Sequence, residues 1–462
     1  MTSSLKDPTY YLEKAPVPKA ILYMAIPMIL GMMVNLIYCL TDTFYIGQLK
    51  DTSMIAAVTL AMPFMTLLMA FGNLIGTGTS TYVSRLLGAK KIKNAKRASA
   101  VGFYLSLLAG GLLIAFCVPL LETILPFLGA SKDTLLYTHD YVLALMIGSP
   151  FMIANFAMEQ IVRSEGAAAV SMKGMMLSVG VNMILDPIFI FGFGLNVLGA
   201  AIATVISSAV AVFYYVYYLN KKSKVQSVRL KDCKPNKKIL SEIFKVGVSA
   251  FLLDAFPIAS GLIFNRLAMS YGESVIAAFG IAHHIIHMSE FIAIGFLMGV
   301  VPLMAYSYAA KNKERLNLVV KTSALWLSGI LISMGVLIYI LKLPLLGLFS
   351  IDLSVLKTGE QILTALLIAT FFVGCAGFFT SLFQAEGKGI AATIMSIARG
   401  AAFIPIVIVL SRMFALDGLI WSLAFSEAIA CIIGALMYWK NKSKEIPANT
   451  SNSDGIVTAY PA

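Results

Sequence analysis

Apolar stretches long enough to cross a membrane recur along the whole chain, and this feature constrains the fold more than any other. A helix needs about 20 mainly apolar residues to cross roughly 30 Å of hydrocarbon, where every backbone polar group must be paired internally. Twelve such windows predict spans over residues 20–46, 54–82, 98–120, 134–158, 168–191, 195–219, 239–268, 275–305, 318–341, 358–383, 389–411 and 416–439. We therefore expect an all-α integral membrane protein with twelve transmembrane helices.

Lysine and arginine residues are concentrated in every second loop. Of the 35 in the chain, 29 fall in the two terminal segments and the even-numbered loops. In a soluble protein the net charge of +12 would suggest a nucleic-acid partner, but an alternation between loops is typical of membrane topology instead. The positive-inside rule places both termini in the cytoplasm, and we expect a multi-pass protein with no nucleic-acid partner.

The two halves of the chain match each other at a constant offset of 221 residues. The matching pairs are Ser53–Ala57 with Ser274–Ala278, Leu87–Lys90 with Tyr308–Lys311, and Ser164–Gly166 with Ala385–Gly387. This duplication predicts an N-lobe over residues 1–225 (helices 1–6), a basic cytoplasmic linker over 226–238, a C-lobe over 239–445 (helices 7–12) and a disordered tail over 446–462. Because six spans per half insert both halves with the same orientation, a central cavity is expected between two similarly oriented lobes.

Several short motifs occur in a characteristic order on this repeat. They are Ala25-Ile26-Pro27, Thr41–Gly47, Tyr82–Ala89, Asn182–Pro187 and Leu198–Thr204. In this order the chain resembles the multidrug and toxic compound extrusion (MATE) transporters of the MOP superfamily, most closely their MepA-like branch. The resemblance covers nearly the whole chain. It implies two six-helix lobes in a V around a central cavity, export of amphipathic and often cationic compounds driven by inward H⁺ or Na⁺, and residence in the bacterial cell (inner) membrane.

Four polar residues in the first half are candidates for ion coupling. Asn182 and Asp186 are four residues apart and share a helix face, while Asp42 and Thr204 belong to spans that the topology brings to the same outer half of the bilayer. Pro187 cannot donate a backbone N–H, so it releases a helix carbonyl beside this set, and oxygen atoms of these kinds are preferred by hard cations. The resemblance implies that such residues form the cation or proton site of the N-lobe, with Na⁺ as the metal ion that would fit. The alternatives are an interfacial position for Asp42 and a helix-end polar group for Asp186.

A second polar set lies in the predicted helices 7 and 8. Asp254, His287 and Glu290 are candidates for a proton relay or for recognition of a cationic substrate. His283 shares a helix face with His287, and such a pair can bind zinc, but no further cysteine or histidine cluster completes a site. The sequence therefore predicts no metal there, and a structural polar network stays an equally good interpretation.

Acidic residues near helix ends carry a plainer expectation. Glu159 and Glu165 near Arg163, and Glu386 near Lys388, are expected to form solvated ion pairs or turns. For Arg399 and Glu427, which lie deeper in helices 11 and 12, a buried pair and a substrate contact both stay open.

The expected function is secondary active multidrug efflux by alternating access, with antiport of amphipathic or cationic drugs against H⁺ or Na⁺. No Gly-x4-Gly-Lys-Ser/Thr motif occurs, which disfavours ATP as the energy source. We expect a monomer in the lipid bilayer that is not an enzyme and needs no organic cofactor. One alternative is a flippase for lipid-linked oligosaccharides or peptidoglycan precursors from the same superfamily. An integral-membrane prenyl-phosphate enzyme is a weaker one, because no Asp-rich Mg²⁺ motif is present.

Overall fold

The computed structural model describes residues 9–349 and 352–444, nearly all of them helical; the tail predicted over 446–462 lies outside them. The first half of the chain forms α1 (Thr9–Glu13), α2 (Val17–Gly47), α3 (Thr52–Gly88), α4 (Ile92–Cys117), α5 (Leu121–Phe127), α6 (Leu135–Arg163), α7 (Ala168–Pro187), the π-helix η1 (Ile188–Gly192) and α8 (Asn196–Lys221). After the short helix η2 (Leu230–Asp232), the second half forms α9 (Lys237–Met269), α10 (Glu273–Ala309), α11 (Lys313–Ile340), α12 (Lys342–Gly347), α13 (Leu353–Glu386), α14 (Gly389–Gly400) and α15 (Phe403–Lys444).

The last two predicted spans are found in one long helical segment. Within the described ranges, eleven segments are long and apolar enough to cross a membrane, and the final one covers 53 residues, Gly389–Asn441. This segment is interrupted after Gly400, where Pro405 has no N–H to donate to the carbonyl four residues earlier. It then turns back at Ala415, whose φ of 50° and ψ of −129° are not helical. The segment therefore supplies two spans, in agreement with the twelve predicted.

The internal duplication extends to backbone detail. Helices α3 and α10 are both 37 residues long, and their first and last residues are each 221 positions apart. Each helix is followed by a lysine in the left-handed region, Lys90 with φ 59° and Lys311 with φ 56°. The turn after each of these helices therefore has the same geometry in both halves.

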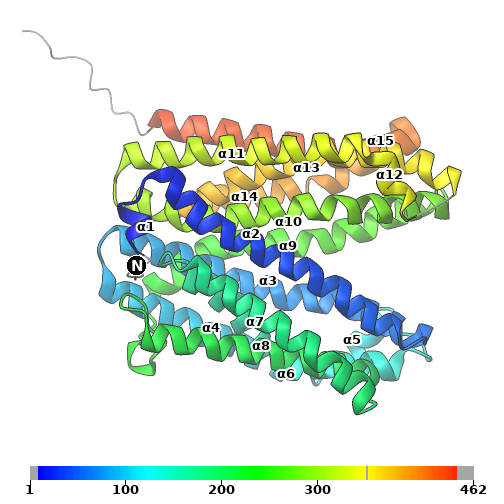
Figure 1. Cartoon of the computed structure of the whole chain (residues 1–462), viewed down its shortest axis with the longest axis horizontal. Helices are drawn as coiled ribbons and strands as arrows, with labels where there is room; N and C mark the ends of the chain where they lie inside the picture. The colour runs from blue at the N-terminus through cyan, green and yellow to red at the C-terminus, as the bar shows by residue number, and fades with distance from the viewer. Residues whose placement is uncertain (1–8, 350–351, 445–462) are drawn as a thin grey trace, which may run out of the picture.

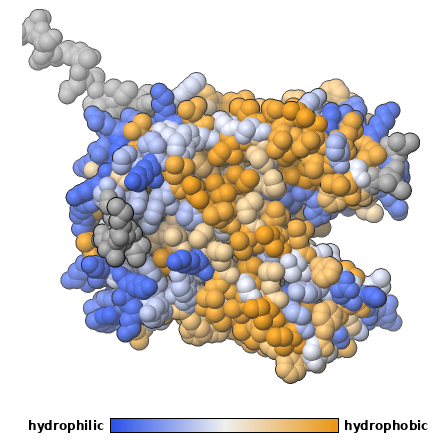
Figure 2. Space-filling model, viewed as in Figure 1, coloured by the Kyte–Doolittle hydropathy of each residue, from blue (hydrophilic) through white to orange (hydrophobic). Residues whose placement is uncertain are grey.

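The helices of the two halves form two groups that separate at one end of the molecule. In Figure 1 the second half lies above the first, and the two meet where α2 packs against α10 and α3 packs against α9. Figure 2 shows a deep notch between the groups at the right, while hydrophilic surface is concentrated at the left end, where the N-terminus lies. The cleft therefore opens at the end opposite the N-terminus, where α2 and α7 finish.

Close contacts between the two halves seal the other end of the molecule. Gly78 of α3 lies directly against the carbonyl of Ile243 on α9, so close that a Cβ would not fit without a shift of the backbone. Near this crossing, Arg85 Nη1 lies 2.8 Å from Glu242 Oε2. Helix packing without side chains and an interhelical ion pair together hold the two lobes in contact at the basic end.

Candidate functional site

Three of the four predicted coupling residues form a hydrogen-bonded cluster inside the first lobe. Asn182 and Asp186 come from α7 and Thr204 from α8, and their exposed fractions are 2%, 0% and 8%. Asn182 Nδ2 donates to Asp186 Oδ1 at 3.3 Å and lies 3.4 Å from Thr204 Oγ1. The hydroxyl of Thr204 donates to the carbonyl of Ala200 at 3.0 Å. The helix period that places Asn182 and Asp186 on one face therefore turns both toward α8.

Asp42 of α2 completes this cluster without a direct hydrogen bond to it. Its carboxylate is close enough to Asp186 for the two charges to interact, and no lysine or arginine among the described residues has a comparable interaction with either one. Two tyrosines, Tyr38 of α2 and Tyr141 of α6, also lie within electrostatic range of both carboxylates. Tyr38 precedes Asp42 by four residues and shares its helix face, so the sequence held a signal for it; Tyr141 comes from a distant span and had none.

Two oxygen atoms of this cluster are left without a hydrogen-bond donor. Asn182 Oδ1 and Asp186 Oδ2 are both fully enclosed and have no partner within the part of the chain that the structure describes. Buried polar atoms are normally paired, and an unpaired carboxylate oxygen is especially costly. The donor set of carboxylate, amide and hydroxyl oxygens fits a proton or a hard cation such as Na⁺. The local chemistry is therefore that of an anionic pocket that lacks its counter-charge.

The N-lobe pocket lies at the same end of the molecule as the cleft. Asp42 is five residues from the end of α2, and Asp186 is one residue from the end of α7. The helix changes to π-type directly after Pro187, which has no N–H to continue the α-helical pattern. Proline therefore ends the regular helix beside the pocket.

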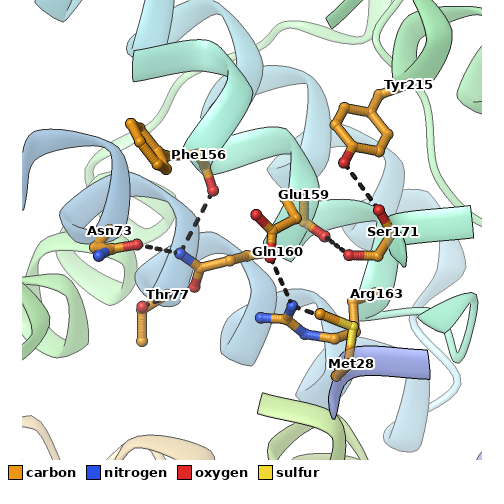
Figure 3. Close-up of polar contacts among 9 residues, drawn as sticks. All are labelled: Met28, Asn73, Thr77, Phe156, Glu159, Gln160, Arg163, Ser171 and Tyr215. Atoms are coloured by element: carbon orange, nitrogen blue, oxygen red, sulfur yellow. Dashed lines mark hydrogen bonds and ion pairs between the residues drawn. The ribbon is translucent and has the colours of Figure 1, made fainter. Parts of the chain in front are cut away.

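A second polar region lies between the lobes, around a cavity of about 410 Å³. Asp254 of α9 faces this cavity and accepts a hydrogen bond from Asn73 Nδ2 of α3 at 2.7 Å. Asn73 Oδ1 in turn accepts from Gln160 Nε2 at 2.7 Å, and Gln160 Oε1 accepts from Thr77 Oγ1 at 2.8 Å. Figure 3 shows the N-lobe part of this chain, in which the amide of Gln160 points toward Asn73. These hydrogen bonds link α6 and α3 of one lobe to α9 of the other.

The sequence analysis did not identify Asn73 or Gln160, although both are isolated polar residues inside apolar spans. Such residues are expensive in a membrane and usually face a bundle interior or a cavity. That rule alone would have identified them.

The prediction of solvated ion pairs near helix ends was wrong for Glu159 and Glu165. Glu159 is bonded to Arg163 Nη1 at 3.2 Å in a pair whose side chains are only 13% and 6% exposed, and Figure 3 shows it between Ser171 and Arg163. Glu165 is 2% exposed and accepts hydrogen bonds from Tyr218 Oη at 2.7 Å and Ser223 Oγ at 2.6 Å. The lobe covers these helix ends with neighbouring helices, which their position in the sequence could not indicate.

The candidates in helix α10 form a connected string. His283 Nδ1 and His287 Nε2 lie 2.9 Å apart, and His287 Nδ1 lies 3.3 Å from Glu290 Oε2. Asp254 lines the same cavity as Glu290, but its hydrogen bond goes to Asn73 rather than to this string. The structure therefore brings His287 and Glu290 together and leaves Asp254 on a separate part of the wall.

Arg399 and Glu427 form a buried pair. Arg399 Nε donates to Glu427 Oε2 at 3.1 Å, and the two side chains are 17% and 13% exposed. Arg399 also lines the interlobe cavity. Of the two interpretations that the sequence left open, the ion pair is the one observed.

Comparisons with known proteins agree with this architecture. The family model MatE matches residues 27–188 and 255–410. The chain is 39% identical over 428 residues to the multidrug export protein MepA of Staphylococcus aureus (strain N315), covering 93% of this chain and 94% of that protein. It is 36% identical to MepA of Staphylococcus haemolyticus (strain JCSC1435), with 94% and 96% coverage. The fold is similar to that of an outward-facing multidrug resistance MATE family transporter of the MOP superfamily, with a TM-score of 0.88, 25% identity and coverage of 94% and 98%.

Proposed function

This chain belongs to the MatE family, and from that premise we propose that it is a secondary active transporter that exports amphipathic and cationic drugs in exchange for H⁺ or Na⁺. Its similarity to multidrug export proteins over almost its full length supports drug efflux as the general activity. The coupling ion, the exchange mechanism and the roles of individual residues are the parts that we infer.

The observation that carries the coupling proposal is the missing counter-charge of the N-lobe pocket. Asp42 and Asp186 interact with each other, and Asp186 Oδ2 is enclosed without a donor. Two carboxylates in a poorly hydrated site cannot both stay charged without compensation, so the pocket holds a proton or a cation. Binding of that ion would favour one access state over the other, and the ion gradient would then drive the cycle.

The interlobe cavity is the proposed drug site. Its two arginines are already neutralised, Arg163 by Glu159 and Arg399 by Glu427. Asp254 and Glu290 contribute acidic groups whose observed partners are the amide of Asn73 and the imidazole of His287. The remaining charge favours cationic ligands, and we assign Asp254, His287 and Glu290 to substrate recognition, with a proton relay through His287 as the alternative role. A flippase that held pyrophosphate would need unpaired cations here instead.

An efflux assay tests this proposal. Cells that lack their own pumps would be loaded with a lipophilic cationic dye or with an anionic dye of similar size, and efflux would be followed with the proton and sodium gradients collapsed separately. We expect export of the cation alone, and its loss when one of the two gradients is removed. Equal export of both dyes, or export that survives the loss of both gradients, would contradict the proposal.

The orientation is a separate part of the proposal. The basic end of the molecule is assigned to the cytoplasm, so the cleft in Figure 2 opens to the exterior. In a background that retains Cys233 as its only cysteine, an impermeant thiol reagent should leave intact cells unlabelled. A cysteine introduced in place of Lys132 should react. The reverse pattern would invert the topology.

A further inference from the structure

The histidine string of α10 has the arrangement of a metal chelate. His283 and His287 are one helical turn apart, and His283 Nδ1 faces His287 Nε2 across 2.9 Å. Zinc bonds to imidazole nitrogen at about 2.0–2.1 Å with tetrahedral angles, so two such ligands stand roughly 3.3 Å apart around the ion. An opening of a few tenths of an ångström would admit a metal in place of the shared proton.

Glu290 stands where an outer-sphere partner is normally found. Its Oε2 lies 3.3 Å from His287 Nδ1, on the ring nitrogen that does not face His283. Histidine ligands usually direct their second N–H to a carboxylate, which fixes the tautomer and makes the free nitrogen a better ligand. Phe291 stacks on the His287 ring with centroids 5.6 Å apart. The ring of His287 is therefore held in one orientation from two sides.

The chelate is open to solvent-sized space. His283 is exposed and lines a second cavity of about 460 Å³ inside the C-lobe. Ligand atoms of His283, His287 and Glu290 all lie within 4.8 Å of one another. An ion can therefore reach the pair and keep water molecules as its remaining ligands.

Nearby charge does not exclude a divalent ion. Arg399 lies close enough to Glu290 for their charges to interact, but it is neutralised by its own pair with Glu427 at 3.1 Å. Glu290 therefore remains available to offset part of the charge of the metal.

From this geometry we propose that His283 and His287 form a binding site for a divalent transition metal such as Zn²⁺, Ni²⁺ or Cu²⁺, with Glu290 as the positioning residue of His287. Imidazole ligands suit these ions, whereas Mg²⁺ and Ca²⁺ require oxygen donors. The inference does not depend on the transport function.

The test is equilibrium binding of Zn²⁺ to the purified full-length protein without a histidine tag. We expect one saturable site, no competition from excess Mg²⁺, and loss of this site in both His283→Gln and His287→Gln. Glu290→Gln should weaken binding about 10- to 100-fold, as outer-sphere partners usually do. The matched control is His284→Gln, because His284 is adjacent in sequence but its ring lies 6.4 Å from that of His287.

Cu²⁺ provides a spectroscopic readout that activity does not influence. Electron paramagnetic resonance of the copper-loaded protein should show coupling to two imidazole nitrogens, and to one in His283→Gln. Zinc binding that persists in both histidine variants, or that His284→Gln weakens equally, would overturn the assignment. So would a parental protein with no saturable site.

Discussion

The same position in the two lobes is filled with opposite chemistry. The duplication relates Asp42, Asn182 and Asp186 to Ile263, Phe403 and Val407 through the offset of 221 residues, and it relates Thr204 to Leu423. In the C-lobe these equivalents belong to one hydrophobic core cluster, in which Phe403 and Val407 are 5% and 0% exposed. The N-lobe has an enclosed polar pocket at this position, with two oxygens that lack donors.

This difference shows that the fold does not need polar residues at this position. Apolar side chains pack there in the C-lobe, and replacing buried charges by well-packed apolar groups is often neutral or stabilising. The N-lobe pocket therefore opposes the stability of its own lobe unless an ion or proton is bound. A chemical role in coupling accounts for it.

The largest expected effect is on transport. Asp42→Asn and Asp186→Asn should each insert at the parental level, because the amide preserves size, and should lose gradient-driven efflux by tenfold or more, which is at least about 1.4 kcal/mol in the driving step. Efflux per unit of membrane-inserted protein measures this. Asp254→Asn is the control from the cavity wall. If both N-lobe variants pump at the parental rate while Asp254→Asn fails, coupling belongs to the C-lobe.

The next effect concerns stability and exchanges the chemistry of the two lobes. Val407→Asp should destabilise the C-lobe by roughly 3–5 kcal/mol, because it buries a carboxyl group among apolar side chains. Asp186→Val should leave the N-lobe within about 1 kcal/mol of the parental protein or more stable. Apparent Tm in detergent compares the two, and Val407→Asn separates the effect of charge from that of polarity. Equal losses in both lobes would show that the polar pocket is structural.

A smaller effect is expected from ion binding itself. An ion that binds only the folded protein stabilises it by about 2.7 kcal/mol at a concentration 100 times its Kd. The Tm of the parental protein should rise with Na⁺ at constant ionic strength, or with acidification if the ion is H⁺, while that of Asp186→Asn should not. A rise that persists in the variant would place the ion elsewhere.

The smallest effect is expected at the exposed Glu13–Lys90 pair, where Glu13 Oε1 lies 2.6 Å from Lys90 Nζ. The hydrogen bond from Lys90 holds the pKa of Glu13 below its ordinary value of 4.5, and the same contact raises the pKa of Lys90 above 10.5. The pair therefore stabilises the folded state between these values and is lost as pH falls through the pKa of Glu13. Lys90→Gln should cost less than about 1 kcal/mol, because exposed pairs are weak. A larger change in Tm would mean that α1 closes the basic end through this contact.

The sequence by itself determined the elements and their order. Span length is fixed by bilayer thickness, loop charge indicates orientation, and the repeat of 221 residues follows from local identity. The pairing of Asn182 with Asp186 is also local, because the helix period alone places residues four apart on one face. These features depend on neighbours along the chain, so they could be predicted without a fold.

Only the tertiary structure decided which polar groups meet across the chain. Asn73 and Asp254 are 181 residues apart and bond to each other because α3 and α9 cross at the lobe junction. Glu165 is buried because Tyr218 and Ser223 fold over the helix end that would otherwise be solvated. Asp42 joins Asp186 because α2 packs on α7. Such contacts depend on how helices pack in three dimensions, which the periodicity of a single helix does not specify.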